Sequence, residues 1–185
     1  MIGRIGTKIM SKQDVNNQFE KVIEARHGQN NDTFSLYNNE FIGSLSVFNV
    51  LKFMKEPTAA KILLVLPLVF HNDLVSFLNN GKTKVRSIEE LIIKKPEFVS
   101  NFNSRFYSLI RVSINSILIL QKMKLINIGE DGIINLVDEQ KELLPSYDKK
   151  SIGNRALNII KSSQVIADIL DEKVEKIYLQ LKVKL

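Results

Sequence analysis

The chain has 185 residues, of which 44% are hydrophobic and 25% are charged, and it contains no cysteine. This composition excludes a disordered chain, and the length suits one domain or one domain with an appendage. Without cysteine the chain forms neither disulfides nor thiolate zinc sites, which fits a reducing compartment. The net charge of +6 indicates contact with nucleic acid or an acidic protein surface, or it reflects only the lysine bias of an AT-rich coding sequence.

Two features of the sequence argue against export or a membrane location. The first residues lack the apolar stretch, about 7–15 residues long, of a secretory signal. The most apolar run covers residues 62–70; Pro67 interrupts it, and it is far shorter than the roughly 20 residues of a membrane span. We therefore expect a soluble, cytoplasmic protein with no membrane partner.

Hydrophobic periodicity predicts a mainly helical chain. Helix starts are indicated by Asn38 or Asn39 and by Thr58 as N-caps, by a capping box that begins at Ser87, and by Pro96 in a first turn. Pro67 is expected to break the apolar helix that follows Thr58. The expected helices cover, in chain order, residues 13–26, 39–54, 59–66, 73–78, 88–94, 96–109, 108–124 and 154–170.

Residues 125–136 alternate apolar and polar side chains around a Gly-Glu-Asp-Gly turn, which predicts a β-hairpin. Helices followed by such a hairpin, over about 87–136, are the pattern of a winged helix, although other α+β domains share it. We therefore expect a mainly α (α+β) fold, a helical domain that contains a winged-helix unit. The expected divisions are an N-terminal extension over 1–35, a helical core over 36–137, a linker over 138–153, and a C-terminal helix and tail over 154–185.

No catalytic or metal-binding pattern stands out in the sequence. His27 and His71 have no His, Asp or Glu three or four residues further on, as a helical ligand pair needs, and His71 is better explained by a bond to a helix end. Glu130 and Asp131 lie on the predicted hairpin turn, whereas paired catalytic carboxylates need a cleft. We therefore expect no enzyme activity, no metal and no cofactor, and a protein that works by binding partners.

The helix over 108–124 is a poor candidate for reading DNA. A recognition helix presents a broad polar and basic face, but here only Arg111, Asn115 and Lys122 form a narrow polar stripe. The acidic hairpin turn would also repel phosphates. The apolar arc of this helix is wider than one core-facing side, which indicates a second buried contact within the domain or with a partner chain. The candidate partner contacts on this helix are Val112, Ile119 and Met123.

A basic loop and the chain end are two further candidate surfaces. Lys82, Lys84 and Arg86 precede the capped helix and are candidate contacts to the DNA backbone, although they serve equally well as a solvated surface. At the chain end, apolar residues at every second position predict a terminal strand, or a short helix followed by an extended tail. This end either closes the core of the protein or docks on a partner through Ile177, Tyr178, Leu181 and Val183.

Four blocks of the chain, in order, carry a resemblance to a known family: LYNNEFIGSLSVFNVL (36–51), ILLVLPLVFHNDLVSFL (62–78), the stretch over 87–136, and NRALNIIKSSQVIADILDEKVEKIYLQLKVKL (154–185). Together they resemble the middle component of three-component ABC-ATPase systems, which belong to the Lamassu-type bacterial defence systems. The Ile-Tyr-x-x-Leu-x-Val ending of that family is matched here by Ile177, Tyr178, Leu181 and Val183. Asn39 and Lys182 stand where the family often has proline and glycine, and residues 1–35 have no counterpart.

The resemblance implies a non-enzymatic accessory subunit. It would join a coiled-coil ABC ATPase related to the chromosome-maintenance (SMC) family to an effector, often a nuclease, and it would meet foreign DNA through the assembled complex. The alternative is a winged-helix transcription regulator, which should bind a palindromic site as a dimer. An accessory subunit should instead co-purify with a large ATPase and bind DNA weakly, with a strong dependence on salt.

Overall fold

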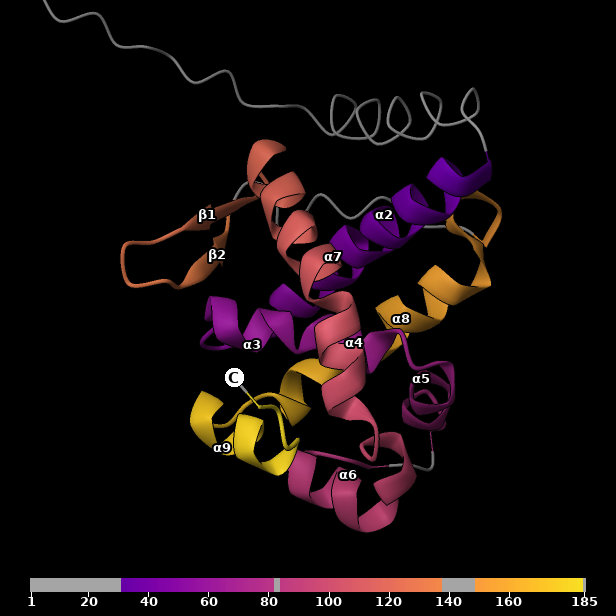
Figure 1. Ribbon diagram of the computed structural model, residues 1–185, viewed down its shortest axis with the longest axis vertical. Coiled ribbons are helices and arrows are strands. Elements are labelled where there is room, and N and C mark those ends of the chain that lie inside the picture. The colour runs from indigo at the N-terminus through magenta and orange to yellow at the C-terminus, as the bar shows by residue number, and fades with distance from the viewer. Residues whose placement is uncertain (1–30, 82–83, 138–148, 185) are drawn as a thin grey trace, which may run out of the picture.

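The computed structural model describes residues 31–81, 84–137 and 149–184, which are predominantly helical with one small antiparallel sheet (Figure 1). This confirms the expected mainly α fold with a β-hairpin. The predicted helix over 13–26 and most of the predicted linker over 138–153 lie outside the described residues. The elements are α2 (Asn31–Leu51), α3 (Ala59–Leu63), α4 (Val65–Val69), α5 (Asn72–Leu78), α6 (Ile88–Lys94), the 3₁₀ turn η1 (Pro96–Phe98), α7 (Phe102–Lys122), β1 (Ile126–Ile128), β2 (Ile134–Leu136), α8 (Lys149–Ile169) and α9 (Val174–Gln180).

Helices α2 and α7 cross closely because small side chains meet where they touch. A Cβ atom on Gly43 of α2 would lie 2.5 Å from Ser116 Oγ of α7 and 3.1 Å from Leu66 Cδ1. Ser116 is buried, and its hydroxyl donates a hydrogen bond of 2.8 Å to the Val112 carbonyl of its own helix. The serine therefore brings no unsatisfied polar group into the crossing, and the two backbones approach at the distance that glycine allows.

The predicted boundaries of the helices that became α2 and α7 are wrong. Helix α2 begins at Asn31 rather than at Asn38 or Asn39, because an asparagine permits a helix start without forcing one and no Gly or Pro interrupts residues 31–39. The two helices expected over 96–109 and 108–124 are a single 3₁₀ turn and one continuous helix, α7. Pro96 starts only the turn, and nothing between residues 102 and 122 breaks the helix that follows.

The apolar segment after Thr58 forms two short helices that are almost wholly buried. Thr58 is the N-cap of α3, as predicted, and its side chain accepts a hydrogen bond from the Lys61 amide. The break lies at Leu64, not at Pro67, which sits inside α4. Proline has no N–H for the carbonyl four residues earlier and its ring crowds that carbonyl, so a helix bends one turn before it. In the described part of the chain no single helix is long and apolar enough to cross a membrane; α3–α4 and α5 pass that test only together, bent by 95°.

Helices α5 and α6 begin at side-chain caps. The Leu74 amide donates to Nδ1 of His71 at 3.2 Å, which confirms that this histidine is bonded to a helix end. The Glu90 amide donates to Ser87 Oγ at 3.2 Å, as a capping box requires. The Glu90 carboxylate accepts from the Arg86 amide instead of the Ser87 amide, so the box closes one residue earlier than predicted.

The predicted hairpin is confirmed, with Ile126 opposite Leu136 and Ile128 opposite Ile134. It is tied to the start of α3, because the Ile134 amide donates to the Pro57 carbonyl at 2.8 Å and Thr58 forms a bridge with Ile133. Figure 1 shows the hairpin beside one end of α7 and α6 at the other end of the molecule. The helices and the hairpin between residues 87 and 136 are therefore not packed together at one place, and a winged-helix unit stays a prediction.

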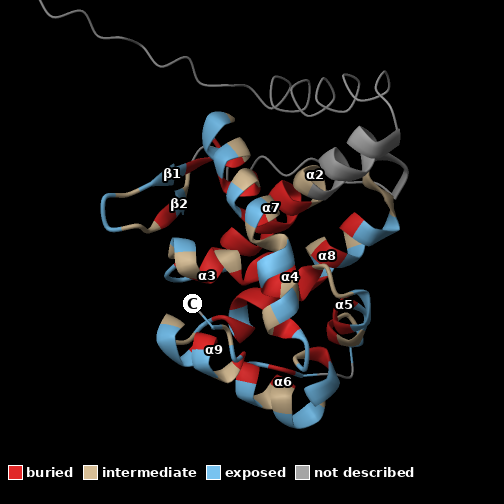
Figure 2. Ribbon diagram, in the orientation of Figure 1, coloured by how far each residue is buried: buried red, intermediate tan, exposed pale blue. Residues whose placement is uncertain are grey.

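The C-terminal helices complete the core (Figure 2). Helix α8 packs against α2 and α5 and is interrupted at Gly153, whose φ of 77° is rarely adopted by residues with a side chain. The chain then forms α9, which confirms the expected short helix and shows that the terminal strand is wrong. After α9 the chain turns at Leu181 and Lys182, and the Val183 amide donates to the Tyr178 carbonyl at 3.0 Å, so the extended tail expected after the helix is not found there. One continuous cluster of buried apolar residues runs from Val47 in α2 to Leu181 after α9. The expected division into a helical core and a C-terminal segment stays a prediction.

Candidate partner interface

An apolar stripe lies on the solvent side of α7. Tyr107, Ile114 and Leu118 are exposed by 48%, 46% and 54%. Their spacing of seven and four residues places them on one side of the helix. The opposite side is fixed in the core, where Phe102, Phe106 and Leu120 are at most 1% exposed. The stripe therefore cannot turn inward, since any rotation of α7 would bring these core residues into water.

Basic side chains accompany the stripe. Arg111 and Lys122 are exposed and belong to the same side of the helix, and α7 has no Asp or Glu along its whole length. We call Tyr107, Arg111, Ile114, Leu118 and Lys122 the α7 face. At the start of the helix the face meets the chain end, where the Tyr107 hydroxyl donates to the Lys184 carbonyl and the Lys184 amide donates to Asn103 Oδ1. At the border with α2, Asn115 Nδ2 donates to Glu40 Oε1 at 2.5 Å.

The residues predicted as partner contacts on this helix are only partly exposed. Val112, Ile119 and Met123 are of intermediate burial, and Val112 and Met123 pack against the core. Val112 lies at the α2–α7 crossing, where its Cγ1 would be 3.5 Å from a Cβ on Gly43. Partner contact through these three residues stays a prediction. The sequence indicates a surplus of apolar residues on this helix, but it does not identify Ile114 and Leu118 as the exposed ones, because only the crossing with α2 fixes which side of α7 faces solvent.

The predicted docking residues at the chain end pack within the protein. Ile177, Tyr178 and Leu181 are buried, and Val183 is partly buried against the same core. The Tyr178 hydroxyl donates to the Ala60 carbonyl at 2.9 Å and thereby joins α9 to α3. This burial favours the alternative in which the segment closes the core, and its docking on a partner stays a prediction.

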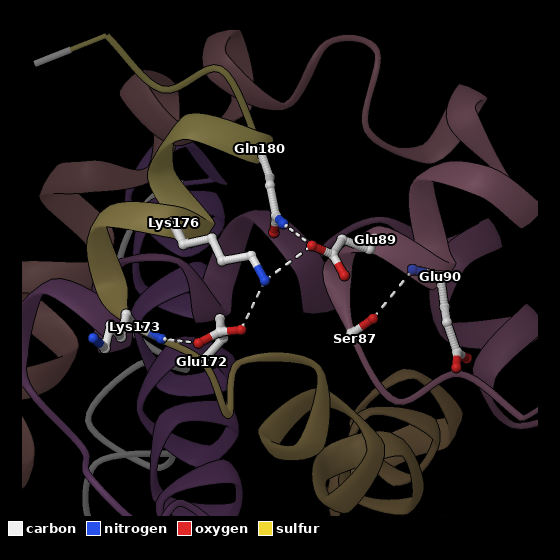
Figure 3. Close-up of polar contacts among 7 residues, drawn as sticks. All are labelled: Ser87, Glu89, Glu90, Glu172, Lys173, Lys176 and Gln180. Carbon is white, nitrogen blue, oxygen red and sulfur yellow. Dashed lines mark hydrogen bonds and ion pairs between the residues drawn. The ribbon is translucent and has the colours of Figure 1, made fainter.

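A cluster of polar side chains joins α9 to α6 (Figure 3). Glu89 of α6 accepts hydrogen bonds from Lys176 Nζ at 2.9 Å and from Gln180 Nε2 at 2.8 Å. Lys176 also pairs with Glu172 at 2.9 Å, and these bonds raise the pKa of Lys176. The Lys173 amide and then Lys176 lower the pKa of Glu172. Each contact is solvent-exposed and individually weak. These contacts therefore orient α9, whereas the buried side of α9 supplies the stability.

The basic loop before α6 is described only in part. Lys82 lies outside the described residues, and Lys84 and Arg86 are exposed. Their backbones are held: the Lys84 carbonyl accepts from Lys94 Nζ at 2.5 Å, and the Arg86 amide donates to Glu90. Both side chains remain available to a phosphate. The acidic Glu90 beside them, whose pKa is lowered first by the Arg86 amide and then by Lys94, reduces the local positive potential.

No arrangement for metal or acid–base chemistry is found among the described residues. No group of three or more His, Cys, Asp or Glu side chains there could hold a metal. His71 serves as a helix cap, contacts the Phe98 ring, and has a pKa lowered by burial and then by Arg105. A shallow cavity of about 190 Å³ between α5 and α8 is lined by Asn72, Ser76 and Asn158, with Arg155 stacked 4.9 Å from the centre of the Phe70 ring. None of these groups is a nucleophile poised beside a base.

Comparison with known protein families gives a match over most of the chain. Residues 29–185 match a family model described as the ABC-three component (ABC-3C) system Middle Component 3. The comparisons with curated proteins and with solved structures found no match. The matched region contains every described element, including the whole of α7 and the chain end.

Proposed function

The chain belongs to the middle component 3 family of ABC-three component systems, and from this premise we propose that it is a non-catalytic adaptor that joins the ATPase of its system to the effector. A middle component of a three-component system has partner subunits. An adaptor needs a surface for these partner subunits that is not buried within its own fold. The exposed α7 face, fixed in place by a core-facing opposite side, is the observation that carries this proposal.

The finer assignment rests on the resemblance in the sequence. We propose that the ATPase is an SMC-like coiled-coil protein, that the effector is a nuclease, and that the system is a Lamassu-type defence against phage or plasmid DNA in the cytoplasm. Foreign DNA would reach the adaptor within the assembled complex. Support for an indirect DNA role comes from α7, which carries Ile114 and Leu118 where a DNA-reading helix carries polar side chains.

The proposal is tested by purifying the three components together and separately. The adaptor alone is expected to show no nuclease and no nucleotidase turnover, and to migrate with the ATPase when the two are mixed. Metal-dependent turnover by the isolated chain that is lost on substitution of His71 would contradict the non-catalytic role. A dimer of the isolated chain that binds a palindromic site with nanomolar affinity would instead identify a transcription regulator.

A further inference from the structure

We propose that the α7 face is the docking site for an acidic amphipathic helix of a partner subunit, an inference that rests on the proposed adaptor function. The face runs from Tyr107 to Lys122, which corresponds to about 22 Å along the helix axis. Its residues are separated by four, three, four and four positions, so they form one continuous ridge. A second helix packs on such a ridge by setting its own apolar side chains on either side of Ile114 and Leu118.

The apolar half of the face favours a protein partner over nucleic acid. Ile114 and Leu118 lie one turn apart and are each about half exposed, and neither side chain has a group that could donate to a phosphate or a base edge. Burial of an aliphatic side chain of this size contributes most where it is central and closed off from water. The two residues occupy the middle of the face, between Arg111 and Lys122, which is the arrangement of an apolar centre with a polar rim.

The charges around the face favour an acidic partner. Arg111 and Lys122 belong to the face, Lys124 follows it, and Lys184 lies beside Tyr107. Two acidic groups of neighbouring elements are engaged by hydrogen bonds within the protein. Glu40 of α2 accepts from Asn115, and Asp131 of the hairpin turn accepts from the Ile133 amide. A helix with Asp or Glu along the edges of its apolar stripe would therefore meet a positive rim and be steered toward it.

Substitutions on the face are compared with the same substitutions elsewhere. Ile114→Glu and Leu118→Glu place an acidic group in the centre of the face, and binding of the adaptor to its ATPase or effector should weaken roughly tenfold or more. Ile93→Glu on α6 and Leu179→Glu on α9 are matched controls, because these residues are 80% and 78% exposed and lie on other elements. The controls should change the dissociation constant less than about twofold, and equal melting temperatures show that all four variants are folded.

A separate variant tests whether the partner is acidic. Arg111→Glu should weaken binding and reverse part of its salt dependence, since a repulsion then replaces an attraction. If Arg111→Glu binds as well as wild type at all salt concentrations, the partner is not acidic. If wild type does not bind any partner subunit, the proposed adaptor function is wrong. If wild type binds and Ile114→Glu and Leu118→Glu bind equally well, only the α7 face is wrong.

The occupant is identified by cross-linking within the assembled complex. A photoreactive residue at position 114 should attach to a helical segment of the ATPase or effector that is rich in Asp and Glu. A photoreactive residue at position 93 should not attach to that segment. Attachment at position 114 to residues 13–26 of the same chain, to a second copy of the chain, or to DNA would overturn the proposal and name the true occupant.

Discussion

Gly43 is the residue on which the placement of α7 depends most directly. Gly43→Ala gains helix propensity worth about 1 kcal/mol, but the new Cβ would stand 2.5 Å from Ser116 Oγ. We expect a net loss of about 1–2 kcal/mol in the free energy of unfolding, because overpacking at a helix crossing outweighs the propensity gain. Urea unfolding measures the change.

Two controls isolate the steric cause at Gly43. Gly81→Ala should be nearly neutral, since a Cβ there would meet no atom within 4 Å. Ser116→Ala removes the oxygen that clashes, so the double variant Gly43→Ala/Ser116→Ala should recover most of the stability. A double variant as unstable as the sum of the single changes would mean that the crossing does not depend on this contact.

Lys52 carries a half-buried charge that destabilises the fold. Its ammonium lies 4.3 Å from the centre of the Phe48 ring, and burial lowers its pKa from 10.5 to about 8. Between these two values the unfolded chain binds more protons than the folded chain, so the charge destabilises the fold fully below about pH 8, and this cost disappears as the pH rises toward 10.5. Stability should therefore rise with pH in that window.

The variant Lys52→Met should be more stable than wild type at pH 7 by about 1 kcal/mol, a value reduced for the solvent screening of a half-buried ammonium. The difference between the two proteins should shrink between pH 8 and pH 10.5. Urea unfolding of both proteins across this range measures it, and a difference that stays constant with pH would show that packing, not charge, separates them.

At the scale of elements, α9 is expected to stabilise the fold. Deletion of residues 176–185 removes Ile177, Tyr178 and Leu181 from the core. The loss of each large buried side chain costs about 2–5 kcal/mol, against a total stability of about 5–15 kcal/mol. We expect the truncated chain to unfold or aggregate in thermal denaturation. Deletion of only residues 184–185 should leave it folded.

A single hydroxyl tests the same element without unfolding it. Tyr178→Phe removes the bond to the Ala60 carbonyl and should lower the free energy of unfolding by about 0.5–1.5 kcal/mol.

If the chain without residues 176–185 keeps its melting temperature but no longer binds its partners, the segment is a docking element and does not close the core.

The basic loop before α6 carries a prediction for the assembled complex. Replacing Lys82, Lys84 and Arg86 together by Glu should weaken DNA binding about equally for all sequences, because phosphate contacts carry no base information. The slope of log affinity against log salt should decrease by about 2–3, one counterion for each lost contact. Filter binding at several salt concentrations measures both effects, and unchanged affinity would show that the loop only solvates the surface.

The local features of this fold could be predicted from the sequence, and the interface could not. The caps at Thr58 and Ser87 and the hairpin turn depend on neighbouring residues, and each is where the sequence indicated. The side of α7 that faces solvent depends on Gly43, more than sixty residues earlier in the chain. Periodicity identified an apolar arc that was too wide, but only the crossing assigns Ile117 to the core and Leu118 to the surface.

At the scale of the whole molecule, a single core supports the exposed face. Buried residues of α2, α4, α7, α8 and α9 belong to one cluster, and the chain end returns to contact the start of α7. The face is therefore presented by a rigid support rather than by a loop. A surface of this kind binds a partner helix with little loss of its own conformational entropy, which suits a subunit that holds two others together.

The central claim, that this middle component joins two other subunits, is tested most directly by leaving it out. The ATPase and the effector of the same system are co-expressed with and without this chain, and the masses of the purified assemblies are measured. The account predicts one assembly that contains all three subunits when the chain is present, and separate ATPase and effector when it is absent. An ATPase–effector assembly that forms equally well without the chain would contradict the adaptor role.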